Sequence, residues 1–570
     1  MPGHSPAGAT VRDRLITPSQ LALFSRSPRI GAWWEELHAI DPQRAPRPAT
    51  APLDALLFET GLAHETVLID ELKASGRSVA ELRGRQEEED YAATLAAMRS
   101  GVDFIWQASL RNSEMRGAAD LLERIDRPSA LGDWSYIPIE CKLSSHPRPI
   151  YLVQACAYCE LLEPILGARP EHFSLYLGGQ RFQRYATADV QSWYERLRQR
   201  YREFRAGFDP SVEPEDAPGD HGLWDAFIQQ RLEQKRDLIL VAGMRASQRN
   251  RLCAAGIRTI DQLAEWPEDR PVNGLDHPVL LRLRDQARIQ LASELNPQGT
   301  PAFVVRPLAQ QGRGLAMLPA PDEGDIWFDM EGFPDPIRDE KLDYLFGACH
   351  RDPDGALCFA DWWAHDPAAE KQAFDGFVRW VEQRRAAYPN LHVYHYASYE
   401  KTALGNLASR HAIHQDLIDQ WLRDELLVDL YPIVRHGLLI GATSYSIKKV
   451  ERLYGGAREQ EVETAADSVV RYAQWRKTQD LGILDDLRRY NEKDCQVTEG
   501  LHRFLCSLPA IEQIPFRANR WGCASREQAE EPTSTVHVKA LETAARELLQ
   551  ERPESTYNPD AIGPRGISWR

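Results

Sequence analysis

The sequence predicts an α/β chain of several domains. Before residue 215 and after residue 318, short apolar segments that end in acidic residues alternate with segments of helical periodicity. Between these two parts, residues 237–297 carry helical patterns alone. A chain of 570 residues also exceeds what one domain usually holds, about 100–200 residues. We therefore expect four parts, which span residues 1–215, 216–305, 318–510 and 511–570.

Acidic and basic side chains lie on two neighbouring predicted strands of the first part. Asp120 follows Gly117-Ala-Ala at the end of one segment, and Glu140 and Lys142 lie two positions apart on the next apolar strand. Residues two apart in a strand point to the same face, so Glu140 and Lys142 project together. Carboxylates suit hard Mg²⁺ or Mn²⁺ ions, which can generate hydroxide near neutral pH. We expect Asp120 and Glu140 to bind metal and Lys142 to position the attacking water.

Residues of two predicted helices extend this pattern. His64 lies in the helical run that starts at Gly61, where it could complete the metal shell. Gln154 and Tyr158 lie four apart on one helical face, within reach of the same cleft or of the substrate. With the strand residues, they make the chain resemble the RecB-type branch of the PD-(D/E)XK nucleases, which includes CRISPR-associated RecB-like exonucleases. The resemblance implies a restriction-endonuclease-like α/β core.

Cysteine spacing predicts that an iron–sulfur cluster, which many members of that branch hold, is absent here. No cysteine precedes Cys141, and the next cysteine after Cys159 is Cys253. Such a cluster needs four thiolates. The pair Cys156 and Cys159 forms one CxxC motif without a second pair, which is a weak zinc signal and more typical of small apolar helix residues.

A second group of acidic residues occurs in the part from residue 318 to 510. Asp329 and Glu331 lie two apart on an apolar strand, and Glu400 follows a strand at the start of a helix. Tyr490 and Asp494 lie four apart on a predicted helix and share a face. Carboxylates that converge on one point repel each other unless cations neutralise them. We expect two metal ions roughly 3.5–4 Å apart to bind the attacking and leaving oxygens.

This second pattern resembles the DEDD exonucleases of the RNase H-like fold, in the subgroup with a tyrosine in the last motif. The resemblance implies 3′→5′ exonuclease activity, with Asp329, Glu331 and Asp494 as metal ligands and Tyr490 orienting the water. Glu400 stands where that family usually has Asp, and its longer side chain can still reach a metal. Asp429 is an alternative ligand, although an Asp at a strand end is commonly a turn or cap residue.

The net charge of −16 predicts that nucleic-acid contact is confined to local basic patches. One patch is the arginine-rich helix at residues 193–205, where Arg196 and Arg200 could follow a phosphate backbone and the interleaved aromatic residues could stack on bases. The alternative is an amphipathic helix that packs inward through one face, and this alternative is favoured for the aromatic residues. That face consists of Trp193, Leu197, Tyr201 and Phe204.

A second patch is expected in the central helical part. Residues 241–263 resemble a helix-hairpin-helix module, whose Gly-x-Gly hairpin offers backbone N–H groups to a phosphate. Gly243 is present, but Arg245 replaces the second glycine. A structural spacer and a phosphate-binding module both remain open, and the spacer is slightly favoured.

Composition places the chain among cytoplasmic enzymes. No run approaches the roughly 20 apolar residues of a membrane span, and nine scattered cysteines fit a reducing compartment. The chain contains no Gly-Lys dipeptide and hence no P-loop, so any unwinding would need a separate helicase. One more helix is expected at residues 536–550, followed by a loose tail.

The order of the parts resembles predicted bacterial RecB-like nucleases. We expect a metal-dependent nuclease with two sites that acts on DNA, on single strands or at ends, in repair, recombination or defence. The alternatives are an RNA-processing nuclease, a nucleic-acid-binding protein in which one site is inactive (more readily the RNase H-like one), and an adaptor in which both sites are inert.

Overall fold

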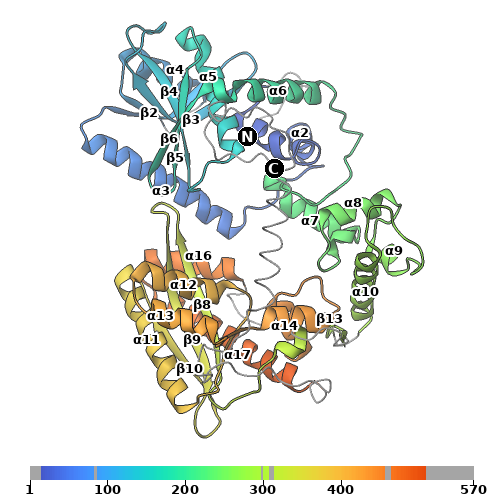
Figure 1. Ribbon diagram of the computed structural model, residues 1–570. Coiled ribbons are helices and arrows are strands. Elements are labelled where there is room, and N and C mark those ends of the chain that lie inside the picture. The colour runs from blue at the N-terminus through green and yellow to red at the C-terminus, as the bar shows by residue number, and fades with distance from the viewer. Residues whose placement is uncertain (1–13, 83–86, 297–298, 307–312, 456–463, 509–570) are drawn as a thin grey trace, which may run out of the picture. The chain divides into compact units, whose positions relative to one another are not determined.

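The computed structural model describes residues 14–82, 87–296, 299–306, 313–455 and 464–508. All of these residues belong to one compact unit that spans residues 1–519. Two sheets with covering helices and a set of helices between them in sequence confirm the predicted mixed α/β, multidomain class (Figure 1). The helix expected at residues 536–550 and the tail that follows it lie outside the described residues.

A six-stranded sheet forms the core of the N-terminal part, and its strands follow one another in sequence order. The strands β2, β3 and β4 are antiparallel, whereas β1 pairs in parallel with β2, and β4 pairs in parallel with β5. The strand bounds are β1 Val79–Glu81, β2 Phe104–Arg111, β3 Arg116–Ile125, β4 Ser135–Lys142, β5 His172–Leu177 and β6 Arg181–Ala186.

Helices α3 (Pro52–Ala74) and α5 (Pro149–Leu166) cover this sheet (Figure 1). Leu68 of α3 packs in one buried cluster with Ile139 of β4. Because side chains alternate along a strand, Glu140 and Lys142 point to the face opposite Ile139. The remaining helices of this part are α1 Pro18–Arg26, α2 Gly31–Ile40, α4 Glu87–Ser100 and α6 Thr187–Ala206.

The central segment folds into helices, as its periodicity predicts. The short helix η2 (Gly222–Trp224) and α7 (Asp225–Gln234) share a buried cluster with Trp34 of α2. The next elements pack around a core of their own, which includes Leu252, Leu263 and Leu283. Their bounds are η3 Leu238–Leu240, α8 Ala246–Ala254, α9 Ile260–Ala264 and α10 His277–Glu294.

The C-terminal part contains a five-stranded sheet in the order β10-β9-β8-β11-β12. The strands β8, β9 and β10 are antiparallel, and β11 pairs in parallel with both β8 and β12. The strand bounds are β8 Ile326–Asp335, β9 Glu340–Arg351, β10 Leu357–Trp363, β11 Val393–His395 and β12 Leu427–Asp429. A separate short pair joins β7 (Phe303–Val305) to β13 (Leu438–Ile440).

Alternation along β8 decides which helix each of its side chains meets. Phe328 stacks on Phe377 of α11 (Pro367–Ala387). Trp327 instead lies in a buried cluster with Leu501 of α17 (Leu481–Cys506). Asp329 and Glu331 are two and four residues after Trp327, so they face α17 as well. The other helices are η4 Gly314–Met317, α12 Tyr399–His411, α13 Gln415–Arg423, α14 Leu430–Gly437, α15 Ile447–Val450, η5 Glu451–Leu453 and α16 Ala465–Thr478.

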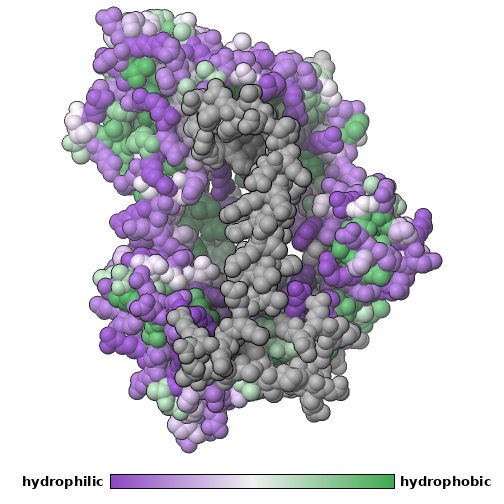
Figure 2. All heavy atoms as spheres, in the orientation of Figure 1, coloured by the Kyte–Doolittle hydropathy of each residue, from purple (hydrophilic) through white to green (hydrophobic). Residues whose placement is uncertain are grey.

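The sequence predicts no membrane-spanning helix, and the length and polarity of the observed helices bear on this prediction. Within the described ranges, each helix is too short or too polar to span a lipid bilayer. In the view of Figure 2, hydrophilic residues cover most of the described surface, and hydrophobic residues form small separate groups.

Candidate active sites

The first candidate site lies where β3 and β4 run side by side. The backbone N–H of Cys141 donates a hydrogen bond of 2.8 Å to Oδ2 of Asp120. Nζ of Lys142 lies 2.5 Å from Oε1 of Glu140 and 3.8 Å from Oδ2 of Asp120. The structure therefore brings together the three strand residues that the sequence analysis singles out.

Burial and neighbouring charges shift the pKa values of the ionisable groups in this first site. Glu140 is buried, and burial together with the Asp120 carboxylate raises the pKa of Glu140 to about 8, which Lys142 opposes. Burial lowers the pKa of Lys142, but Glu140 and Asp120 outweigh it, so this pKa is raised overall. Oε2 of Glu140 is buried and has no hydrogen-bond partner among the described residues. A carboxylate oxygen in this state fits a cation ligand, since an unsatisfied buried acceptor is costly.

Glu65 of α3 is a further carboxylate at this site. Its Oε2 accepts hydrogen bonds from Trp106 Nε1 at 2.8 Å and from Gln107 Nε2 at 2.7 Å. Burial and the Asp120 carboxylate raise the pKa of Glu65, and the two hydrogen bonds lower it. The sequence analysis did not select Glu65, although it directly follows His64.

His64 lies apart from these acids. Its buried ring stacks on Tyr176, with the ring centres 4.4 Å apart, and burial lowers its pKa. Tyr176 pairs in register with Cys141, whose side chain points to the face opposite Glu140. The structure therefore does not bring the His64 ring to the predicted metal ligands.

The two predicted residues of α5 differ in their surroundings. The hydroxyl of Tyr158 donates a hydrogen bond of 2.6 Å to the carbonyl of Ala118, two residues before Asp120. Burial raises the pKa of Tyr158 well above its ordinary value. This bond ties α5 to β3 beside the acids. Gln154 lies one turn earlier on the same helix and is partly exposed.

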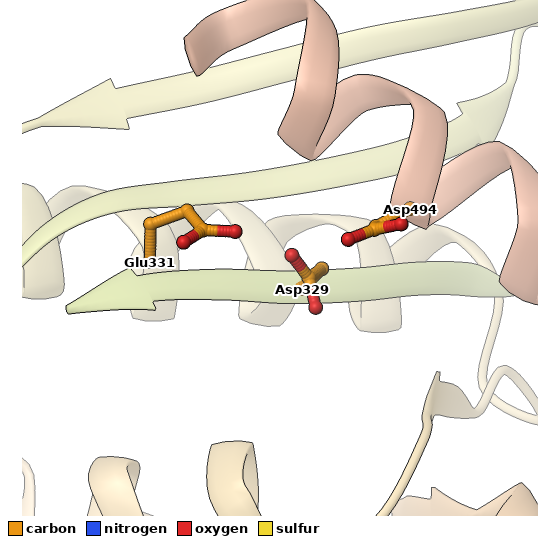
Figure 3. Close-up of side chains that lie close together, drawn as sticks. All are labelled: Asp329, Glu331 and Asp494. Atoms are coloured by element: carbon orange, nitrogen blue, oxygen red, sulfur yellow. The ribbon is translucent and has the colours of Figure 1, made fainter. Parts of the chain in front are cut away.

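The second candidate site is a cluster of three carboxylates on β8 and α17. Asp329 and Glu331 project from β8 towards Asp494 of α17 (Figure 3). One carboxylate oxygen from each of the three residues lies within 4.8 Å of the others. In the part of the chain that the structure describes, this is the one group of three or more potential metal ligands that meets this spacing.

Polar neighbours hold two of these carboxylates in place. Asn491 Nδ2 donates to Oδ2 of Asp329 at 2.7 Å, and the Ser468 hydroxyl donates to Oε2 of Glu331 at 2.7 Å. Burial raises the pKa of Glu331 to about 8; the Ser468 bond and Lys448 lower it, whereas Asp494 raises it. Asp329 and Glu331 are therefore positioned before any ion binds.

Tyr490 lies one turn before Asp494 on α17 and is buried. Nζ of Lys448 donates to its hydroxyl at 3.3 Å and also acts electrostatically on Glu331. Lys448 thus links the predicted tyrosine to the carboxylates. The sequence analysis did not select it, and neither did it select Ser468 or Asn491.

Glu400 and Asp429 lie outside the cluster of three. Oε2 of the buried Glu400 is 3.3 Å from His395 Nδ1, and burial raises the pKa of Glu400. Asp429 Oδ1 accepts from the backbone N–H groups of Ala397 and Tyr431, which makes it the N-cap of α14. Glu400 still acts on Glu331 electrostatically, so it lies near the cluster without joining it.

Comparison with known proteins identifies the second site's domain. Residues 326–506 match the family model of the RNase_H superfamily. This part of the chain is an RNase H-like domain. The match runs from β8 to the last residue of α17, so it contains all three clustered carboxylates. No curated protein matches the chain.

The RNase H-like domain indicates a nuclease-type hydrolase with a nucleic acid as substrate and divalent metal as cofactor. The carboxylate cluster is consistent with that cofactor, since hard divalent cations prefer oxygen ligands.

The predicted nucleic-acid residues are placed as follows. Arg196 and Arg200 are exposed on α6, whereas Leu197 and Tyr201 of the same helix are buried. The inward packing favoured for that face is thus confirmed for these two residues, while Trp193 is half-buried. Arg245 is exposed in the loop just before α8.

Proposed function

We propose that this chain is a metal-dependent nuclease that hydrolyses DNA phosphodiester bonds at two sites. The carrying observation is the convergence of Asp329, Glu331 and Asp494 within 4.8 Å in an RNase H-like domain. Three carboxylates at this spacing repel one another in the absence of a cation. Burial raises the pKa of Glu331, and the Asp494 carboxylate raises it further, which agrees with such repulsion.

The donor set of the second site fits Mg²⁺ or Mn²⁺, because it consists of carboxylate oxygens. Asp329, Glu331 and Asp494 would hold the ion, which would neutralise phosphate charge and supply an activated water. Ser468 and Asn491 keep two of these carboxylates oriented. Tyr490, whose hydroxyl Lys448 contacts, is suited to orient the attacking water, and we assign this domain a 3′→5′ exonuclease activity by its resemblance.

We assign the second activity to the N-terminal part, as a RecB-like nuclease site. Its support is the meeting of Asp120, Glu140 and Lys142, with Tyr158 anchoring the adjacent backbone. Oε2 of Glu140, which has no hydrogen-bond partner in the described part of the chain, supports a cation at this position. Lys142 lies between the two carboxylates, where an ammonium group can position a water or a phosphate oxygen.

For the substrate, we propose DNA single strands or DNA ends, in repair, recombination or defence, with any helicase supplied by another protein. This choice rests on the resemblance to RecB-like nucleases. RNA remains the alternative that the experiment below separates.

A cleavage panel tests the proposal. Labelled single- and double-stranded DNA and RNA, marked at the 5′ or the 3′ end, are incubated with the full chain in Mg²⁺, Mn²⁺ or EDTA. Four proteins are compared: wild type, Lys142→Ala, Asp494→Asn and the double variant. We expect each single variant to lose one activity by about 10²-fold or more and the double variant to lose both, because the sites act independently.

Two outcomes would contradict the proposal. Cleavage that survives in the double variant would place the chemistry elsewhere. Folded wild-type protein that cleaves none of the substrates would leave a binding or adaptor role. Preference for RNA over matched DNA would keep the sites and change the substrate.

A further inference from the structure

Five arginine side chains and one histidine gather where the central helices meet α14 and the β7–β13 pair. They come from five separate places in the sequence, and we call them the basic surface. Its members are Arg245, Arg282, Arg306, Arg313, Arg435 and His436.

Backbone contacts bring these stretches together. A Cβ atom placed on Gly243 would overlap Nη2 of Arg435, so the loop that carries Arg245 touches the end of α14. Arg306 donates from its backbone N–H to the carbonyl of Gly437 at 2.8 Å and from Nε to that of Leu438 at 3.1 Å. Arg306 is thus fixed beside Arg435 and His436.

Two further contacts add Arg313 and Arg282. A Cβ atom on Gly314 would lie 2.9 Å from the nitrogen of Gly437, which places Arg313 next to His436. On α10, Gln286 donates to the carbonyl of Ile440 at 2.8 Å and accepts from the Tyr445 hydroxyl at 3.2 Å. Arg282 lies one turn before Gln286, and the Arg435 guanidinium lies 4.5 Å above the Tyr445 ring.

In the part of the chain that the structure describes, the arginines of this surface form no ion pairs with acids. Among the described residues, none of its five arginines has a carboxylate oxygen within 4.0 Å of its nitrogens, in a chain whose net charge is −16. Arg245, Arg282, Arg313 and His436 are exposed. Burial and the neighbouring Arg435, Arg306 and Arg245 lower the pKa of Arg282, which is consistent with mutual repulsion.

The basic surface continues towards the carboxylate cluster. Arg313 and His436 line a cavity of about 310 Å³, and Lys401 and Asp429 line it as well. Lys401 follows Glu400, which acts electrostatically on Glu331 of the cluster. Glu425 also lines this cavity, so acidic and basic side chains both line it.

We propose that the basic surface binds the phosphate backbone of a nucleic-acid single strand whose end enters the RNase H-like site. This inference rests on the proposed function and adds the path of the substrate. Phosphates supply the missing counter-charges, and guanidinium groups bind them through paired N–H donors. The helical segment that contains Arg245 then acts as part of the substrate platform and not as a spacer.

Binding of a fluorescent oligothymidine to the full chain in EDTA, followed by anisotropy over a range of salt concentrations, tests this inference. The test variant carries Arg245→Ala, Arg282→Ala and Arg313→Ala, which are all exposed positions. Each phosphate contact contributes about 0.7 to the slope of log K against log salt for a single strand. We expect the slope to become shallower by about 2 and the affinity to fall for every sequence tested.

A matched control removes the same charge elsewhere. Arg258→Ala, Arg379→Ala and Arg423→Ala change three exposed arginines that each pair with a carboxylate. We expect this control to retain at least most of the wild-type slope. Equal slopes in the test variant, the control and the wild type would overturn the inference, as would an equal loss in both variants.

The cleavage assay separates this failure from failure of the proposed function. If the wild type cleaves and the test variant binds like the control, the basic surface is not the substrate path and the nuclease proposal stands. If the wild type neither cleaves nor binds nucleic acid, both proposals fail. Thermal unfolding of the two variants is compared first, and a matched melting temperature shows that both are folded.

Discussion

At the residue scale, the composition of the first site depends on which of two adjacent residues of α3, His64 or Glu65, faces the strand acids. Successive helical residues point about 100° apart, so only one of His64 and Glu65 can face the strand acids. The His64 ring stacks on Tyr176, whereas the pKa of Glu65 responds to Asp120 and Lys142. Glu65 is thus the residue of the pair that lies at the site.

Glu65→Gln therefore tests this assignment. In an Asp494→Asn background, which silences the second site, we expect Glu65→Gln to raise the Mn²⁺ concentration for half-maximal cleavage by about 10–100-fold, because a charged neighbour of the metal is lost. His64→Leu keeps the ring's volume in its apolar stack and should leave this Mn²⁺ requirement within a few-fold. If His64→Leu instead raised the Mn²⁺ concentration for half-maximal cleavage more than Glu65→Gln did, His64 would be the metal ligand.

Lys448 offers a second test at this scale, through its effect on Glu331. Removal of its charge in Lys448→Met should raise the pKa of Glu331 further, since Lys448 lowers it. We expect the activity–pH profile of the RNase H-like site to shift upward by roughly one pH unit. The control is Lys449→Met, which removes an exposed neighbour's charge. An unshifted profile for Lys448→Met, or equal shifts in both, would show that Lys448 does not act on the carboxylates.

At the scale of elements, the second site depends on how closely α17 approaches the sheet. Gly347 of β9 pairs in register with Asp329 of β8, and a Cβ atom on Gly347 would overlap Oδ1 of Asn491. Asn491 is fully buried and holds Asp329, and it lies three residues before Asp494. The glycine therefore leaves the space that lets α17 deliver Asp494 to the strand.

Gly347→Ala should displace α17. We expect it to lower the free energy of unfolding by about 1–3 kcal/mol, as overpacking usually does, and to reduce the cleavage that we propose for the RNase H-like domain. Gly405→Ala is the matched control. Apart from the adjoining backbone of α12, no atom of the described residues lies within 4 Å of its Cβ position, and alanine favours helices. Denaturant unfolding and the cleavage assay measure both effects. A variant with wild-type stability and activity would show that the backbone tolerates the methyl group.

The same elements show what the sequence could predict. The two-residue period of a strand predicted that Glu140 shares a face with Lys142, and Asp329 with Glu331. The spacing of about four residues in a helix predicted that Tyr490 shares a face with Asp494. These are local relations within one strand or helix. Glu65, Lys448 and Ser468 reach their sites from other elements, and Ser468 lies 137 residues from its partner Glu331. No local period signals such a contact, so tertiary packing alone reveals it.

At the scale of the whole molecule, the predicted α/β class and the central helices follow from hydrophobic patterns, and the structure confirms both. The order of the strands in each sheet could not be predicted from these patterns. The parallel placement of β11 between β8 and β12 brings Glu400 towards the cluster, but side-chain direction leaves it against His395. A resemblance between motifs identifies candidate site residues such as Glu400 by their order along the chain. It does not give the distances between their side chains in the folded protein.

The buried carboxyl groups of the two candidate sites couple the stability of the folded chain to pH. The pKa values of Glu140 and Glu331 are raised from 4.5 to about 8, so between these values the folded chain binds protons that the unfolded chain does not. Without metal, the contribution of these two carboxyl groups to the free energy of unfolding must then fall as pH rises towards about 8 and change little above it. Buried His502, with its pKa lowered to about 3, has the opposite effect, which ends near its ordinary value of 6.5.

In the window from about pH 6.5 to about pH 8, Glu140 and Glu331 therefore lower the free energy of unfolding as pH rises, and Asp325, whose burial raises its pKa to about 7, adds to this effect in the lower part of the window. In EDTA we expect the melting temperature to decrease across it, and Mn²⁺ should raise the melting temperature more at the upper end, where less proton is displaced on binding. The control is the double variant Glu140→Gln with Glu331→Gln. Its melting temperature should decrease less across this window, and Mn²⁺ should raise that melting temperature much less than in the wild type. If metal-free wild type instead gains stability across this window, or Mn²⁺ stabilises the control equally, the two buried carboxylates are not the groups that couple folding to metal.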